Sequence, residues 1–462
     1  MPLYNINTVN ASLQLTAAAA IDYSTVLIVD CNHLTTDRTT VYTSVDGYSS
    51  VVPSGTPLRK MLDSAFSSSA APAKVVVGRA KGDAIVTPAD AIESDTYSFT
   101  IEVKDGYSLS VSHTTASLED QEDIATAWKA LIDGDSNISD HVDATVTGTG
   151  VDASLTLTLV DSDSDDFALS DETDNVSYVS VISESPADSI SGIREVNTDW
   201  TYIVATDHSP TYQDAMAVVA TIYQKLYVTS TALEEAYQAW DGTSTPDANN
   251  IPAVFRFNQY NFAHCVYSHQ ADEYPEAVRI TEFTDVKPGK DDFQYKNLAG
   301  FQLAQIADGS RALNGNELYN LQNTYASTFI SLGGVTVIGG NRVASGVRIE
   351  AIAVLNYFRQ ELQRKADTLM LRMRKLGIND NDIGLLRNVW ATFLSSNVSV
   401  SGNTQALDPY KPYVITLPKA ADYSFEERAE GTITGSVVCY LDASIDSTVL
   451  NMTLTYRDPA EG

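Results

Sequence analysis

The chain has 462 residues, of which 44% are hydrophobic and 19% charged, and its 60 acidic residues against 29 basic ones give a net charge of −31. This length and composition suit several globular domains with apolar cores. The negative charge argues against general binding to nucleic acid or to an anionic membrane, because phosphate groups would repel it.

The sequence also argues against membrane insertion and against a disulfide framework. No apolar run approaches the roughly 20 residues that a membrane span needs. Residues 1–16 lack the basic and apolar regions of a signal peptide. The three cysteines, Cys31, Cys265 and Cys439, are too few for a disulfide scaffold, so we expect free or buried thiols in a reducing cytoplasm.

The first part of the chain has the pattern of an α/β layer. Residues 1–20 are polar and uncharged, so we expect an extended arm or a flexible terminus there. The apolar run 23–31 predicts a buried strand, and 41–52 predicts a strand and a turn. A short helix is expected at 57–66 and another buried strand at 74–77, an order that favours an α/β fold.

A change of pattern at about residue 95 predicts a β-rich module inserted into this domain. Apolar and polar residues alternate on both sides of the turn at Asp105–Gly106, as in a hairpin. The hairpin, a helix with acidic first turns and two further strands are expected at 97–111, 118–132, 142–146 and 154–160. An acidic, serine-rich tract follows, and we expect the module, 95–190, to lie on the outside.

The α/β pattern returns after the insertion. Residues 200–205 predict a buried strand, 212–223 a helix and 225–229 a strand, which is the order of a βαβ unit. Two further strands are expected at 253–257 and 278–281.

The stretch from Gly333 to Gly384 organises the C-terminal part. A short β run at 335–338 lies between two glycine pairs, and apolar residues then recur at helical spacing from Ile349 to Met373. This predicts a long helix with Gly377 as its C-cap. A second helix and two strands are expected after it, at 383–394, 432–441 and 449–456.

Together these elements predict an α/β fold, in the mixed α+β sense, with several domains and extended terminal arms. The expected parts are an N-terminal arm, an α/β core, the β-rich insertion, an inner domain with the long helix and a terminal arm strand: 1–20, 21–94 with 191–340, 95–190, 341–445 and 446–462.

The long helix is basic within an acidic chain. Its positive residues, with one from the second helix, form a candidate binding surface: Arg359, Arg364, Lys365, Arg372, Arg374, Lys375 and Arg387. One interpretation is a solvated face on a helix that packs within its own domain. The other is an electrostatic contact with an acidic neighbour, which would guide docking and weaken in salt.

Candidate metal sites are weak. Residues 161–172 place carboxylates at several positions of a calcium loop, but Asp166 stands where that loop needs glycine, which favours a solvated acidic loop. Cys31 with His33, and Cys265 with His264 and His269, lack the spacing of zinc ligands. We expect no metal.

Candidate catalytic and cofactor sites are weak as well. The sequence has no GxSxG motif, and its glycine pairs lack the lysine of a phosphate loop. His208 follows a predicted strand, where an α/β sheet can place a site, but a loop histidine beside Pro210 is the simpler interpretation. We expect no cofactor and no enzyme activity.

Several segments, taken in order, resemble those of contractile-tail sheath proteins of bacteriophages. They are AFSSSAAPAKVVVGR ending at Arg79, WTYIVA from Trp200, FQYKNLAG from Phe293, the NTY and ASG motifs ending at Tyr325 and Gly346, and LGINDNDIG ending at Gly384. The likeness covers most of the chain except 95–190.

The resemblance implies a structural subunit that polymerises into a helical tube around a tail tube and contracts to drive that tube through a host envelope. Family members add their terminal segments to a neighbour's sheet, and such heterologous contacts build open helices. The residues expected in these arm strands are Tyr4, Ile6, Val9, Leu13, Leu450, Met452, Leu454 and Tyr456.

The implied partners are further copies of the chain, the tail tube protein, and baseplate and tail terminator or neck proteins, with no nucleic acid. The implied location is the virion, after assembly in the host cytoplasm, with the basic helix facing the tube. Two other classes remain open: a fibre or adhesin whose module at 95–190 binds a ligand, and a hydrolase or oxidoreductase suggested by fold analogy alone.

Overall fold

The structure is a computed structural model. It describes residues 25–67, 71–161, 165–170, 172–284, 288–290, 294–298, 300–373, 376–400, 403, 405–424, 426, 433 and 435–442. The chain divides into two compact units. The α/β unit comprises Ala19–Lys287 and Tyr295–Ala353, and the C-terminal unit includes Pro288–Gln294 and the residues from Val354 onward.

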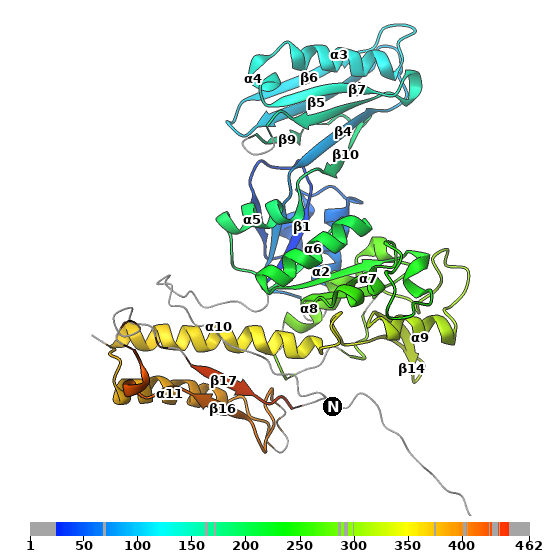
Figure 1. Ribbon diagram of the computed structural model, residues 1–462. Coiled ribbons are helices and arrows are strands. Elements are labelled where there is room, and N and C mark those ends of the chain that lie inside the picture. Colours follow the sequence, from blue (N-terminus) through cyan, green and yellow to red (C-terminus); the bar gives the residue numbers. More distant parts are fainter. Residues whose placement is uncertain are drawn as a thin grey trace, which may run out of the picture. The chain divides into compact units, whose positions relative to one another are not determined.

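The α/β unit is built on an eight-stranded sheet of order β15-β14-β13-β12-β11-β1-β3-β2 (Figure 1). Inner strands pair in parallel, whereas β2 and β15, at the two edges, are antiparallel to their neighbours. The strand order reverses between β1 and β11, which is the doubly wound arrangement. The strands are β1 (Val26–Asp30), β2 (Thr39–Tyr42), β3 (Val75–Arg79), β11 (Tyr202–Ala205), β12 (Leu226–Thr231), β13 (Ala263–Tyr267), β14 (Ser327–Leu332) and β15 (Val335–Gly339).

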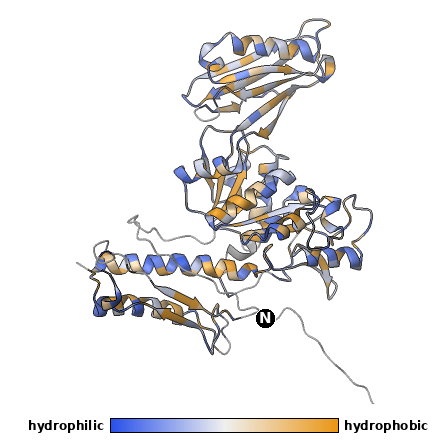
Figure 2. Ribbon diagram, in the orientation of Figure 1, coloured by the Kyte–Doolittle hydropathy of each residue, from blue (hydrophilic) through white to orange (hydrophobic). Residues whose placement is uncertain are grey.

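Burial follows from this topology. Strands β1, β3, β11, β12 and β13 are buried along their whole length, because helices cover both faces of a parallel sheet. Figure 2 shows hydrophobic residues gathered in the part of this sheet around β1. The antiparallel pair β14–β15 turns at Gly333 and Gly334, whose φ angles are +61° and +83°. The expected glycine turn beside the β run is therefore confirmed.

Two groups of helices flank the sheet: α2 packs against α8, and α6 packs against both α5 and α7. Side chains fix several of their starts. Ser185 accepts the N–H of Asp188 before α5, and Asn314 and Glu317 form a reciprocal capping box at α9. The helices of this unit are α1 (Val45–Ser49), α2 (Pro57–Ser67), α5 (Pro186–Val196), α6 (Pro210–Tyr223), α7 (Ile251–Asn258), α8 (Pro275–Thr284) and α9 (Gly315–Asn323).

Three strand predictions in this unit were wrong. Residues 253–257 lie in α7 and 278–281 lie in α8. A short apolar run fits a buried helix as well as a buried strand, and the deciding signals were Asn250, which caps α7, and the prolines in the first turns of both helices. The stretch 41–52 holds the end of β2 and the short helix α1 instead of a strand and a turn.

The inserted module, defined here as residues 82–182, forms two small sheets of order β10-β4-β8-β7 and β6-β5-β9. Helix α3 packs against both, and Trp128, fully buried, lies at 5.1 Å from Phe99 in an edge-to-face contact. Strand β4 pairs within the module, so the insertion begins upstream of residue 95. Its elements are β4 (Gly82–Pro88), β5 (Thr96–Val103), β6 (Ser108–Thr114), α3 (Gln121–Asp133), α4 (Ser136–Ser139), β7 (Val142–Thr147), β8 (Ser154–Leu159), β9 (Phe167–Ser170) and β10 (Val176–Ile182).

Buried polar contacts join this module to the main sheet. Asp166 forms an ion pair with Arg79 at the end of β3, and both side chains are almost completely buried. His33 stacks on Phe167 with ring centroids 4.3 Å apart, and its backbone carbonyl accepts the Leu169 N–H at 2.6 Å. The acidic tract is therefore not a solvated loop throughout, as was expected, because Asp165 and Asp166 point into the protein.

Candidate assembly interface

The C-terminal unit is organised by the long helix α10 (Ile349–Arg372), whose first turn still belongs to the α/β unit. The predicted helix is confirmed, but it ends at Arg372, so Gly377 is not its C-cap as was expected. Figure 2 shows hydrophilic and hydrophobic residues alternating along it. Asn379 caps the following helix, α11 (Asp380–Ser395), by accepting the Asp382 N–H. None of the described helices has the length and apolar character of a membrane span.

An aromatic cluster holds these two helices together. Phe393 of α11 contacts the rings of Tyr357 and Phe358 of α10 at 5.7 Å and 5.5 Å between centroids. Trp390 donates its indole N–H to the carbonyl of Leu362 at 3.0 Å. The indole nitrogen is thus satisfied while the ring is buried, which fixes how α11 lies on α10.

The same unit contains a sheet of only two described strands, β16 (Tyr413–Thr416) and β17 (Ser436–Cys439). Val414 pairs with Val438, and these side chains are 45% and 38% exposed. An isolated two-stranded sheet is marginal in water, and its outer edges present unpaired N–H and C=O groups. Within the described residues, both outer edges of this sheet are open to a further strand.

The described basic residues do not form a single stripe. At 3.6 residues per turn, Lys365 and Arg372 share one face of α10, whereas Arg359 and Arg364 point elsewhere. Arg364 pairs with Glu361 at 2.7 Å, and Lys365 lies 5.7 Å above the Phe393 ring. Arg359, Arg372 and Arg387 are exposed, and Arg387 also donates to the Leu417 carbonyl at 3.2 Å.

Several predicted site residues lie outside the described part of the chain. They are Arg374 and Lys375 of the basic set, and all of the expected arm residues, Tyr4, Ile6, Val9, Leu13, Leu450, Met452, Leu454 and Tyr456.

The residues considered as metal ligands have structural roles instead. His264 is buried, donates from Nδ1 to the Arg342 carbonyl and shares a hydrogen bond between Nε2 and the Ser327 hydroxyl, both at 2.8 Å. Burial lowers its pKa to about 3. Burial also raises the thiol pKa of Cys31 and Cys265. The described residues contain no group of three or more His, Cys, Asp or Glu side chains that could hold a metal ion.

His208 has a partner that the sequence did not reveal. Its Nε2 lies 2.7 Å from a carboxylate oxygen of Glu276, which is completely buried in the first turn of α8. The ring also lies 5.1 Å from that of Tyr274, next to the turn that begins this helix. The pair fastens the loop after β11 to α8, far along the sequence, which no local motif could indicate.

No family model matches the sequence, and no curated protein matches it. Solved structures do. A chain of the anti-feeding prophage (AFP) baseplate, determined by cryo-EM with 6-fold symmetrisation, has a TM-score of 0.53 at 10% identity over 97% of this chain and 99% of that one. A chain of the AFP baseplate in the contracted state gives a TM-score of 0.53 at 9% identity, over 99% and 100%.

A chain of the contracted PVC sheath complex, from an extracellular contractile injection system, gives a TM-score of 0.50 at 11% identity over 100% of this chain and 99% of that one. At these identities the likeness establishes the fold. It confirms the expected α/β class, and its near-complete coverage includes the inserted module, which the sequence motifs did not reach. The chain therefore has the fold of these contractile injection system proteins.

Proposed function

We propose that the chain is a subunit of a contractile sheath, which polymerises into a helical tube and has no catalytic role. The observation that carries this proposal is the match over almost the whole length of chains from contractile injection systems. The open edges of the β16–β17 sheet support it, since a strand from a second copy would complete that sheet by β-augmentation.

The terminal segments 1–20 and 446–462 are the proposed donor strands. Each would leave its own subunit and pair with the sheet of a neighbour, so that contacts propagate along a helix without closing. Contraction would then rearrange subunits as rigid bodies while the exchanged strands stay paired. In a phage tail, this movement would drive an inner tube through the host envelope, after assembly in the host cytoplasm.

The expected partners beyond the chain itself are the tail tube, the baseplate and the tail terminator or neck. The exposed residues Arg359, Arg372 and Arg387 are the proposed contacts to an acidic tube. Replacing all three by glutamate should give particles with tubes that lack an attached sheath in electron micrographs of the infected-cell lysate. Sheaths seated normally on tubes would contradict the tube-facing role and leave the polymerisation proposal standing.

The test of polymerisation acts on the sheet edges. In the β16–β17 ladder Tyr440 donates its N–H to the Pro412 carbonyl, so by alternation the N–H groups of Ile415 and Val437 point to the outer edges. Ile415→Pro or Val437→Pro removes one outward donor while sparing the internal ladder. The matched controls, Ile415→Thr and Val437→Thr, keep the donor.

The proline variants should remain folded by circular dichroism and fail to form tubes by negative-stain electron microscopy, whereas the threonine variants form them. Deletion of residues 1–16 or 446–462 should have the same effect as proline. Normal tubes from both deletions and both proline variants would rule out strand exchange.

A further inference from the structure

The inserted module carries most of the net negative charge of the protein. Residues 82–182 contain 22 Asp and Glu residues and two lysines, a net charge of −20. The other 361 residues contain 38 acidic and 27 basic ones, a net charge of −11. Roughly a fifth of the chain therefore holds about two thirds of the net charge.

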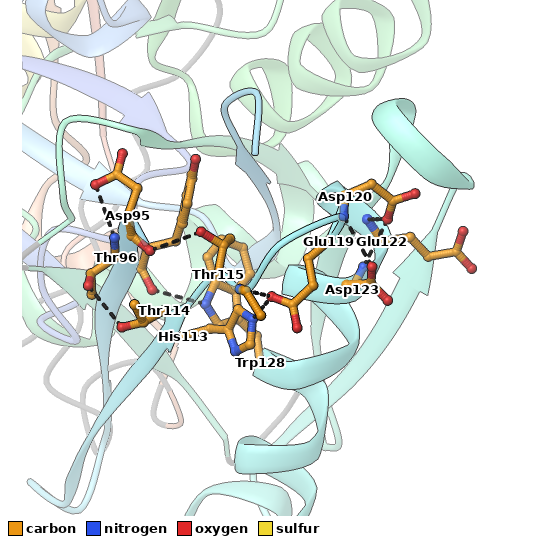
Figure 3. A network of polar contacts seen from close by, with 12 residues as sticks. Asp95, Thr96, His113, Thr114, Thr115, Glu119, Asp120, Glu122, Asp123 and Trp128 are labelled. Carbon is orange, nitrogen blue, oxygen red and sulfur yellow. Dashed lines mark hydrogen bonds and ion pairs between the residues drawn. The ribbon is translucent and has the colours of Figure 1, made fainter. Parts of the chain in front are cut away.

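The carboxylates are concentrated where helix α3 begins (Figure 3). Glu119, Asp120, Glu122 and Asp123 lie within about one turn. Asp120 accepts the N–H groups of Glu122 and Asp123 at 3.0 Å and 3.2 Å, and Asp123 accepts the Asp120 N–H at 3.1 Å. These contacts use backbone donors and the helix dipole, which orient the carboxylates but leave their like charges facing one another.

Two lysines cannot neutralise this surface. Lys129 is already shared between the Asp133 carboxylate at 2.8 Å and the Ala144 carbonyl at 2.6 Å. Arg79, outside the module, pairs with Asp166, and His141 lies 2.7 Å from Asp165. Compensation for the other carboxylates of the module has to come from mobile cations in solution.

The spacing of these carboxylates determines the salt concentration that is needed to screen their repulsion. A domain of this size exposes on the order of 5,000 Å², so neighbouring carboxylates lie about 16 Å apart on average and closer at α3. The screening length is about 10 Å at 0.1 M salt and about 3 Å at 1 M. Repulsion between carboxylates at the average spacing is therefore largely screened at 0.1 M salt, whereas repulsion between the closer carboxylates at α3 persists at ordinary ionic strength and is suppressed only in concentrated salt.

We infer that the inserted module is a salt-dependent fold, stable in molar monovalent salt and loosened by self-repulsion in dilute buffer. The cations act as a diffuse atmosphere, because the described residues contain no cluster that could ligate a metal ion. The main sheet is much less acidic and serves as an internal reference within the same chain. This inference does not depend on the proposed function.

Hydrogen–deuterium exchange of the full-length chain, followed by mass spectrometry from 0.05 to 2 M KCl, tests it. Peptides from β5, β6 and α3 should exchange at least about tenfold more slowly at high salt, which corresponds to about 1.4 kcal/mol. Peptides from β11, β12 and β13 should change by less than about threefold. Equal protection of the module at both extremes would overturn the inference.

A comparison of different solutes distinguishes general charge screening from the binding of a specific ion. Choline chloride should replace KCl at equal concentration, because screening depends on ionic strength. Sucrose at equal osmolality should not replace it. A requirement for K⁺ at millimolar concentration, or protection by sucrose alone, would overturn the diffuse-screening explanation.

Two matched sets of neutralising substitutions, each of two aspartates and two glutamates at exposed positions, complete the test. The module set is Glu93→Gln, Glu102→Gln, Asp143→Asn and Asp152→Asn. The control set in the main-sheet region is Asp37→Asn, Asp46→Asn, Glu195→Gln and Glu234→Gln. The module set should lower the KCl concentration that protects α3, and the control set should leave it unchanged; equal shifts from both sets would overturn the assignment to the module.

Discussion

The inserted module and the C-terminal unit both contain small sheets packed on helices, but among the described residues only the module surrounds its strands with a fully buried core. Strand β5 alternates between buried and outward residues, and Trp128 beneath it is fully buried. In β16 the corresponding alternation is between half-buried and exposed residues. The difference indicates that the module is a finished domain, whereas the two-stranded sheet is suited to receive another strand.

Charge separates the same two regions. The module has a net charge of −20, whereas residues 354–442 contain ten acidic and ten basic residues and are neutral. Copies of a strongly charged surface repel one another, so the neutral region is where subunits of an acidic chain can approach at low electrostatic cost. Among the described residues, the open strand edges thus lie within the stretch 354–442, which is also the neutral one.

The largest expected effect concerns the attachment of the module to the main sheet. Asp166→Asn leaves the Arg79 guanidinium, whose side chain is 2% exposed, without its carboxylate. We expect a loss of about 3–5 kcal/mol in the free energy of unfolding, measured by urea denaturation in 2 M KCl. The double variant Arg79→Met with Asp166→Leu removes both charges, so its free energy of unfolding should fall by less than that of Asp166→Asn. If Asp166→Asn is at least as stable as the double variant, the ion pair does not stabilise the attachment of the module.

One buried tryptophan in the inserted module and one in the C-terminal unit allow the cores of the two regions to be compared. Trp128 and Trp390 are 0% and 8% exposed, and each donates its indole N–H to a backbone carbonyl. Replacing either by alanine should cost about 3–5 kcal/mol. If the proposed function holds, Trp390→Ala should also abolish tubes in electron micrographs, while Trp128→Ala should retain them under conditions where the protein stays folded.

Loss of tubes in both tryptophan variants, or in neither, would remove the distinction between the two regions. The comparison has to be made in concentrated salt, where the module is expected to be stable. Circular dichroism of each variant before assembly separates unfolding from a failure to polymerise.

A smaller effect is expected from His33 at the base of the module. Burial lowers its pKa to about 4, and both ring nitrogens lie 3.3 Å from backbone carbonyls. The unfolded chain, with a histidine pKa of about 6.5, takes up the proton first as pH falls, so stability is lost between about pH 6.5 and 4. His33 should therefore lower the free energy of unfolding by about 2 kcal/mol between pH 7.5 and pH 5.

The measurement is urea denaturation at several pH values for the wild type and His33→Gln, each in 2 M KCl. The glutamine variant does not titrate, so its stability should fall less steeply with acid by that amount. Parallel pH profiles would contradict a neutral, buried imidazole at this junction.

The sequence predicted what local periodicity can encode. Helix α10 followed from an apolar face sustained over many turns, and the β5–β6 hairpin followed from alternation around Asp105–Gly106. The helices α7 and α8 were mistaken for strands because short apolar runs carry no period. Strand β10 was not anticipated, although its pairing with β4 closes the module.

The polar contacts at the candidate sites could not be predicted from the sequence, because they depend on tertiary packing. The Arg79–Asp166 and His208–Glu276 pairs join residues far apart in the chain, and only tertiary packing brings them together. One signal was present: an arginine that ends the apolar run of β3 has to find a carboxylate if it is buried. The positions of β16 and β17 at the edges of their sheet, as far as the described residues show it, could not be foreseen either, since edge positions depend on the order of strands in space.

The smallest effect should come from His141, and its sign is opposite to that of His33. Hydrogen bonding to Asp165 at 2.7 Å raises the pKa of His141, so its contribution is present below about pH 6.5 and is lost as pH rises through the folded pKa. The side chain is 28% exposed, and solvent screening should keep the effect below about 1 kcal/mol. His141→Asn should flatten the decline in α3 exchange protection between pH 6 and 8, whereas His33→Gln should leave that decline intact. If the decline in exchange protection persists in His141→Asn, another group must cause it. In that case the contact of His141 with Asp165 and the contact of His33 with Phe167 would not have opposite dependences on pH.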